Sequence, residues 1–135
     1  MISFTIPGQP KGKARPRMCK SGHVYTPSGT VIYEHRVQAA YLAVAGTVNP
    51  RDEISTVEIV AYFAAPKRIH KKLIGENDWL PCGSRPDADN VAKIVCDALN
   101  KIAWTDDARV ATLKISKRYA MRPRVKVSIV WDEGE

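Results

Sequence analysis

Long apolar runs, a disulfide framework and an excess of acidic residues are all absent from this 135-residue sequence. No uninterrupted apolar stretch approaches the roughly 18 residues that a membrane-spanning helix needs. The N-terminal residues also lack the positive start and the long apolar segment of a secretory signal peptide. We therefore expect a cytoplasmic protein with no membrane partner.

Cysteine is scarce, with only Cys19, Cys82 and Cys96. Their odd number and their spacings match neither a disulfide framework nor a CxxC pair, so we interpret them as reduced thiols. A zinc site built from these cysteines and His23 is an alternative. It is disfavoured because structural zinc sites usually contain two closely spaced pairs, and only Cys19 and His23 are close in sequence.

The balance of charge favours a polyanionic partner. Lys and Arg together number 21 against 14 Asp and Glu, which gives a formal net charge of +7 and a pI near 9.5. Clustered cations gain affinity for nucleic acid because binding releases condensed counterions. Charge alone does not separate a DNA enzyme from a DNA-binding protein.

Repeats, low-complexity tracts and Gly/Ser linkers are also missing, and 44% of the residues are hydrophobic, so we expect one domain over residues 1–135. The Pro- and Lys-rich residues 8–17 read as an extended loop. Hydrophobic spacing predicts strands at 2–6, 54–65, 109–119 and 124–131, helices at 30–46 and 89–101, a short basic helix at 68–73 and a loop at 75–85. This order predicts an α+β fold in which a mixed sheet packs against two main helices.

The apolar faces of these elements should form the core. Val44 is expected to continue the buried stripe of the first helix, and Ala111, Leu113 and Ile115 are expected to form the buried face of the strand at 109–119. In that strand, Lys114 and Arg118 would then face solvent.

Two groups of carboxylates stand at predicted element boundaries, one at 85–90 and the other at 104–107. Each has an ordinary interpretation, as a helix N-cap or as a turn. Asp87 and Asp89 nevertheless lie at i and i+2, so in an extended segment they point to the same side and can share one cation. A third carboxylate from the other group would complete an oxygen site for Mg²⁺, which suggests phosphodiester hydrolysis.

Lys93 follows Asp89 by one helical turn. It could pair with Asp89 or Asp97 at i, i+4, or it could stabilise charge that builds on a phosphate in the transition state. For Asp97 we favour the pairing role.

The strings Arg85-Pro86-Asp87-Ala88-Asp89-Asn90-Val91-Ala92-Lys93, Asp97-Ala98-Leu99-Asn100 and Trp104-Thr105-Asp106-Asp107-Ala108-Arg109-Val110 together resemble the RusA family of Holliday junction resolvases. The similarity is strong over residues 85–118, and residues 47–80 add little to it. Lys13-Ala14-Arg15-Pro16-Arg17 and Tyr25-Thr26-Pro27 resemble the longer-armed members from phages and prophages.

The resemblance implies that Asp87, Asp89 and Asp107 are catalytic, metal-binding carboxylates and that Lys93 is the catalytic lysine. Asp106 is left without an assigned role. It also implies a RusA-like fold and a homodimer, in a bacterial or phage-infected cell, that cuts four-way DNA junctions in paired nicks during recombination and repair. Mg²⁺ would be the cofactor, with Mn²⁺ as a substitute, and no small-molecule cofactor is expected.

Basic residues outside the motif are candidates for contacting DNA, although a solvated arm or a solubilising role is the ordinary alternative for each. They are Lys11, Lys13, Arg15, Arg17 and Lys20 in the N-terminal segment, Arg85 before the first aspartate, and Lys114 and Arg118 in a predicted strand. His23 and Tyr25 could stack on an unpaired base at a branch point. Two rival functions stay open: a nuclease for other branched DNA, and a basic DNA-binding protein without catalysis.

Overall fold

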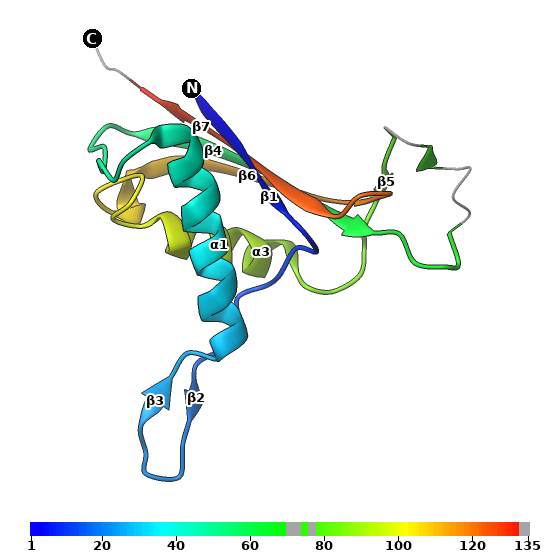
Figure 1. The fold of residues 1–135 in the computed structure, drawn as a ribbon, viewed down its shortest axis with the longest axis horizontal. Helices are drawn as coiled ribbons and strands as arrows, with labels where there is room; N and C mark the ends of the chain where they lie inside the picture. The colour runs from blue at the N-terminus through cyan, green and yellow to red at the C-terminus, as the bar shows by residue number, and fades with distance from the viewer. Residues whose placement is uncertain (70–73, 76–77, 133–135) are drawn as a thin grey trace.

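A mixed five-stranded sheet forms the centre of the computed structural model, which describes residues 1–69, 74–75 and 78–132. The strand order is β1-β7-β4-β6-β5. The strands are β1 (Ile2–Pro7), β4 (Ser55–Ala64), β5 (Leu80–Pro81), β6 (Val110–Ala120) and β7 (Arg124–Trp131). Figure 1 shows both main helices, α1 (Ser28–Ala45) and α3 (Ala88–Leu99), on the same side of this sheet. The predicted α+β fold is confirmed.

The pairing of strands explains where α3 lies. β4 and β6 are parallel, whereas β1, β4 and β5 each pair antiparallel with a neighbour. A parallel pair needs a crossover connection, and here α3 forms part of the chain between β4 and β6. The crossover therefore brings the start of α3 next to β6.

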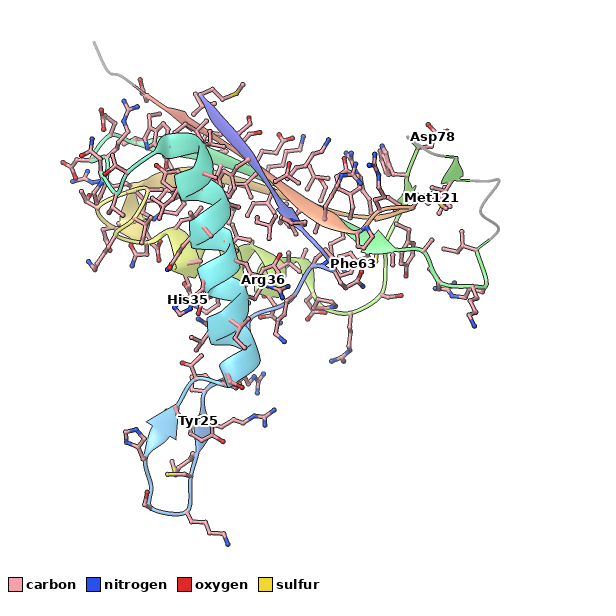
Figure 2. All side chains as sticks on the ribbon, in the orientation of Figure 1. Tyr25, His35, Arg36, Phe63, Asp78 and Met121 are labelled. Atoms are coloured by element: carbon pink, nitrogen blue, oxygen red, sulfur yellow. The ribbon has the colours of Figure 1, made fainter. Side chains whose placement is uncertain are left out.

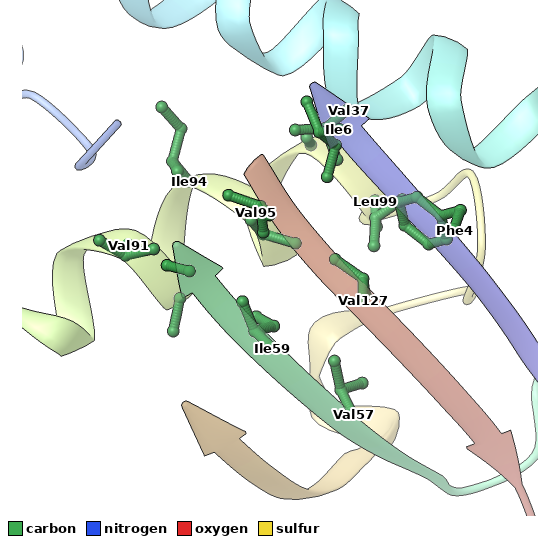
Figure 3. Packing of buried hydrophobic residues seen from close by; sticks show 14 of the residues in the cluster. Phe4, Ile6, Val37, Val57, Ile59, Val91, Ile94, Val95, Leu99 and Val127 are labelled. Atoms are coloured by element: carbon green, nitrogen blue, oxygen red, sulfur yellow. The ribbon is translucent and has the colours of Figure 1, made fainter. Parts of the chain in front are cut away.

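Alternating side chains of the sheet build the core beneath the helices. Val57 and Ile59 of β4 and Val127 of β7 pack with Val37 of α1 and Val95 of α3 (Figure 3). All are fully or almost fully buried, and burial of apolar surface stabilises a fold by roughly 25 cal/mol per Å². The opposite sheet face carries most of the polar residues of these strands.

A two-stranded hairpin extends from the N-terminal end of α1. β2 (Arg17–Met18) pairs with β3 (Val24–Tyr25), and Figure 1 shows this hairpin projecting away from the sheet and helices. Pro10 and Pro16, which lie before and after Arg15, are compatible with the extended path of the chain that leads to this hairpin.

Several expectations about these elements were wrong in detail. Val44 is 55% exposed, and Leu113 is 45% exposed because it borders a pocket rather than the core. The expected loop at 75–85 contains β5, which pairs with the end of β6. Ala111 is also exposed.

Arg68 and Ile69 lie in a turn instead of the expected basic helix, whose other residues, 70–73, lie outside the described part. In the described part of the chain, no helix is long and apolar enough to cross a membrane.

Candidate active site

The first aspartate group lies at the N-terminal end of α3. Asp87 is the N-cap residue, and its backbone carbonyl accepts hydrogen bonds from Asn90 N at 3.1 Å and Val91 N at 3.2 Å. Its carboxylate makes no capping hydrogen bond, so the side chain is not needed to start the helix. Asp89 lies in the first turn, where the positive end of the helix dipole favours a negative charge.

The second group divides its two aspartates between different roles. The carboxylate of Asp106 accepts a hydrogen bond from Ala108 N at 3.4 Å and caps the short 3₁₀ helix η1 (Asp107–Arg109). The carboxylate of Asp107 instead accepts a hydrogen bond from Trp104 Nε1 at 2.8 Å. Trp104 is fully buried, so its indole holds Asp107 from within the core.

These two groups meet at a pocket of about 580 Å³ between α3 and β6. Its charged lining residues are Asp89, Lys93, Asp97 and Asp107, and apolar residues that include Leu113 complete the wall. The fold therefore joins carboxylates that are 18 positions apart in sequence, Asp89 and Asp107, at one concave site. Asp87 is not among the lining residues.

The thiol of Cys96 reports the charge around this pocket. Burial and, to a smaller extent, the nearby negative charges of Asp107 and Asp97 raise the pKa of Cys96 to about 12, while Lys93 acts in the opposite direction. At neutral pH the thiol is therefore neutral, and the pocket carries its charge on the carboxylates and Lys93.

Lys93 takes part in a small ion-pair network. Its Nζ is 3.7 Å from Asp97 Oδ2, which confirms the i, i+4 pair expected for Asp97. The same Asp97 oxygen lies 3.1 Å from Lys13 Nζ, and Lys13 also contacts Glu34 at 3.1 Å. The Lys93 side chain is 60% exposed, so the pair with Asp97 leaves it accessible to a ligand.

A contact with DNA favours an exposed side chain, but the side chain of Lys13 is mostly covered. Its side chain is only 17% exposed and is neutralised by Glu34 and Asp97. Although burial lowers the pKa of Lys13, hydrogen bonds to these two carboxylates outweigh burial, and the net pKa is raised. We expect Lys13 to brace the site, and its contact with DNA stays a prediction.

The N-terminal segment lies directly against the aspartate-bearing loop. Lys13 N donates to Asn90 O at 2.9 Å. A Cβ atom placed on Gly12 would stand only 2.8 Å from Pro86 Cβ, closer than such atoms approach, so glycine is required for this packing. The base of the basic arm is thereby fixed next to Asp87 and Asp89.

Lys117 of β6 anchors the other side of this loop. Its Nζ donates to Ser84 O at 2.6 Å and Pro86 O at 2.8 Å. These bonds tie the residues just before Asp87 to the sheet. The ammonium group also brings a positive charge close to the aspartate group.

The other predicted DNA contacts have different surroundings. The exposed ones include Lys11, Arg15, Arg17 and Lys20 on the arm, Arg85 on the loop, and Lys114, whose side chain is 70% exposed. Arg118 is half-buried and stacks on Trp79, with 3.7 Å between its guanidinium carbon and the ring centroid. His23 and Tyr25 are exposed on the hairpin.

The carboxylates suit a hard divalent cation such as Mg²⁺, which prefers oxygen ligands and binds through one or two protein carboxylates. Asp89 and Asp107 fit this requirement because they line one pocket, and the indole of Trp104 leaves Asp107 Oδ2 available. Over residues 1–69, 74–75 and 78–132, no three His, Cys, Asp or Glu side chains form a group that could hold a metal ion. A three-aspartate cage that includes Asp87 is therefore not assembled in this conformation.

Because the described residues contain no such group, the alternative zinc site of Cys19, His23, Cys82 and Cys96 is not formed among them. All three cysteines are free, as expected.

Two positioning residues escaped the sequence interpretation. Trp104 was noted only as part of a motif, although it lies three residues before Asp107 and donates a hydrogen bond to it. Lys117 lies in the same predicted strand as Lys114 and Arg118, and the sequence interpretation gave it no role of its own. The alternation of the strand places it instead with Leu113 and Ile115, on the side that faces the pocket.

Comparisons with known proteins identify the family of this chain. Residues 7–130 match the family described as Endodeoxyribonuclease RusA. The chain is also 32% identical over 139 residues to the Bacillus subtilis (strain 168) protein named "Uncharacterized protein YqaN", and the match covers 95% of this chain and 94% of that relative. RusA nucleases resolve Holliday junctions and in general depend on a divalent metal. This chain therefore belongs to the RusA family and is an endodeoxyribonuclease, a hydrolase that acts on DNA phosphodiester bonds.

Proposed function

We propose that this enzyme resolves four-way DNA junctions by metal-dependent hydrolysis in the pocket between α3 and β6, as a step in recombination and repair. One observation carries the proposal: Asp89 and Asp107 line the same pocket together with Lys93. Family membership supports the substrate class.

In the proposed site, Asp89 and Asp107 would hold Mg²⁺ or Mn²⁺. The bound ion would polarise the scissile phosphate, orient an attacking water and stabilise the leaving 3′-oxygen. Asp87 stands two residues before Asp89 with a carboxylate that caps nothing, so this side chain is not committed to the helix and would serve as a third ligand. We assign all three aspartates to catalysis on this basis.

Lys93 would bind a non-bridging oxygen of the same phosphate. Its ammonium group lines the pocket and is largely exposed, so it can approach the phosphate without breaking the fold. A cation at this point stabilises the additional negative charge of the transition state more than that of the ground state, which is the requirement for acceleration.

The surrounding contacts would keep these groups in place. Trp104 orients Asp107 from the core, Lys117 ties down residues 84–86, and the Lys13–Asp97 pair braces the C-terminal turn of α3. Such fixed positions matter because a displacement of about 1 Å can lower the rate by about 100-fold.

We further propose that the active form is a homodimer. Resolution of a junction requires two cuts in strands related by a twofold axis, and a symmetric pair of pockets meets this geometry. The exposed cations of the arm and of Arg85 would then contact the duplex arms of the junction.

Substrate comparison tests the proposal. A labelled four-way junction, a flap and a linear duplex of matched sequence are incubated with the enzyme in Mg²⁺, in Mn²⁺ and in chelator. We expect paired, symmetry-related nicks in the junction that require the metal. Faster cutting of the flap would favour the alternative nuclease for other branched DNA, and binding without cutting under all conditions would favour a non-catalytic DNA-binding protein.

A further inference from the structure

The face of the sheet opposite the helices carries a cluster of cations around one aromatic ring. Tyr62 of β4 lies in register with Arg118 of β6 on one side and Arg124 of β7 on the other. The ring centroid of Tyr62 lies 4.0 Å from the guanidinium carbon of Arg124, 5.9 Å from that of Arg118 and 5.8 Å from Lys126 Nζ. Figure 2 shows nitrogen-bearing side chains on this side of the sheet, near Asp78 and Met121. We call Tyr62, Arg118, Arg124 and Lys126 the open-face cluster.

The cations of the cluster have no carboxylate partner among the described residues. An ion pair does lie on the same sheet face, where Lys114 Nζ is 3.9 Å from Glu58 Oε2. This pair is nearer to the N-terminal end of β4 than the cluster is. The three positive charges of Arg118, Arg124 and Lys126 therefore lie close together, on the two strands that flank β4. Like charges this close repel each other unless an anion neutralises them, so the cluster is poised to bind one.

The guanidinium groups are fixed in a geometry that suits phosphate. Arg118 stacks on Trp79 at 3.7 Å and donates to Tyr62 Oη at 3.4 Å, and Arg124 donates to Arg122 O at 2.8 Å. Stacking uses the face of a guanidinium and leaves most of its in-plane N–H donors available for bidentate contact. Part of the side-chain entropy that a phosphate contact normally costs has therefore already been lost on folding, so that ordering these side chains on binding costs less.

The open-face cluster is separate from the active-site pocket. Leu113 and Ile115 of β6 line the pocket, whereas Arg118 has the opposite parity in the same strand and points to the other face. Among the described strands, β6 has only the two-residue β5 as its outer neighbour, so the sheet is narrow on this side. A duplex that leaves the pocket can pass this edge and continue along the open face.

We propose that the open-face cluster is a second DNA-binding site, which contacts the phosphate backbone of a duplex arm while the pocket holds the scissile strand. The proposal rests on the proposed junction-cleaving function for its choice of DNA as the anion. Its chemistry predicts contacts to phosphates without sequence preference, because no element of the cluster is a helix or ribbon that could enter the major groove.

The test compares three variants that keep the fold. Arg118→Gln/Arg124→Gln removes two charges of the cluster, Arg118→Lys/Arg124→Lys keeps them, and Arg36→Gln/Lys101→Gln removes two exposed charges elsewhere. Junction affinity is measured as a function of salt concentration in Ca²⁺, and circular dichroism and thermal unfolding verify the fold. Cleavage is measured separately at saturating enzyme in Mg²⁺.

We expect the Gln pair in the cluster to lower the slope of log affinity against log salt by up to about 1.8, which is about 0.9 per phosphate contact. The Lys pair should keep most of the slope, and the control pair should behave like wild type. Cleavage at saturating enzyme should be unchanged in the Arg36→Gln/Lys101→Gln control pair. An unchanged slope and affinity in the cluster Gln pair, or an equal loss in the control pair, would overturn the second site.

The two proposals fail in distinguishable ways. If wild type binds the junction but never cuts it, the proposed function is refuted, while the salt slopes still decide the open-face cluster. If wild type cuts and the cluster Gln pair retains full affinity, only the second site is refuted.

Discussion

Trp104→Phe removes one hydrogen-bond donor from the active site while it keeps an aromatic ring in the core. The indole Nε1 lies 2.8 Å from Asp107 Oδ1, and Trp104 is fully buried. A hydrogen bond to a charged group contributes about 1.5–3 kcal/mol. If that energy serves to orient Asp107 for metal binding, its loss corresponds to about a 10- to 100-fold slower cleavage step, since about 1.4 kcal/mol equals one factor of ten.

Trp131→Phe is the matched control. Trp131 is also buried, but its Nε1 has no hydrogen-bond partner among the described residues. Both variants lose packing volume and some stability, whereas Trp104→Phe alone loses a contact to a proposed metal ligand. Single-turnover cleavage of a four-way junction, with enzyme in excess and Mg²⁺ varied, separates the two effects.

We expect Trp104→Phe to cleave more slowly and to require more Mg²⁺ for half-maximal cleavage, while Trp131→Phe resembles wild type in both respects. Equal cleavage rates and Mg²⁺ requirements in the two variants would refute the reasoning that the indole positions Asp107.

Three further predictions concern an anchor of the site, a buried hydroxyl of α1 and the order in which two cysteines react. Lys117→Met should slow cleavage about tenfold, with junction affinity nearly retained, because residues 84–86 lose their two contacts to the ammonium; unchanged single-turnover rates would contradict this role. Tyr33→Phe should leave the free energy of unfolding in urea unchanged or raise it by up to about 1 kcal/mol, because its buried hydroxyl has no partner in the described part; a clear loss of stability would argue against this. At pH 8, iodoacetamide should modify Cys19 before Cys96, as read by mass spectrometry: a hydrogen bond from the Ser21 hydroxyl lowers the pKa of Cys19, whereas burial raises that of Cys96 to about 12, and the reverse order would contradict these environments.

Hydrophobic periodicity was sufficient to predict the main elements, because each buries one regular face. In β7, Val125, Val127, Ile129 and Trp131 alternate with exposed or half-buried residues, as expected. The same reasoning was wrong for Leu113 because an apolar face can border a pocket as well as a core. Periodicity shows that one face of a strand or helix is more apolar than the other. It does not show whether the core or a pocket lies against the apolar face.

The candidate site was predictable in its residue types and less so in its contacts. The spacing of the aspartates pointed to Asp87 and Asp89, and the resemblance to RusA nucleases added Asp107. The structure brings Asp89 and Asp107 to one pocket, whereas Asp87 is not among its lining residues. The role of Asp106 as a cap, the engagement of Lys13 by Glu34 and Asp97, and the donation from Trp104 to Asp107 all depend on side-chain directions in three dimensions. Sequence spacing alone does not fix these directions.

The most direct test of the central claim is the effect of Asp89→Asn on cleavage of a labelled four-way junction in Mg²⁺. Asp78→Asn is the control, since Asp78 is an exposed aspartate outside the pocket. The account predicts that Asp89→Asn binds the junction at least as tightly as wild type but cleaves it at least about 100-fold more slowly, equivalent to about 2.7 kcal/mol of barrier, while Asp78→Asn cleaves normally. Cleavage by Asp89→Asn at the wild-type rate would contradict the assignment of the active site to this pocket.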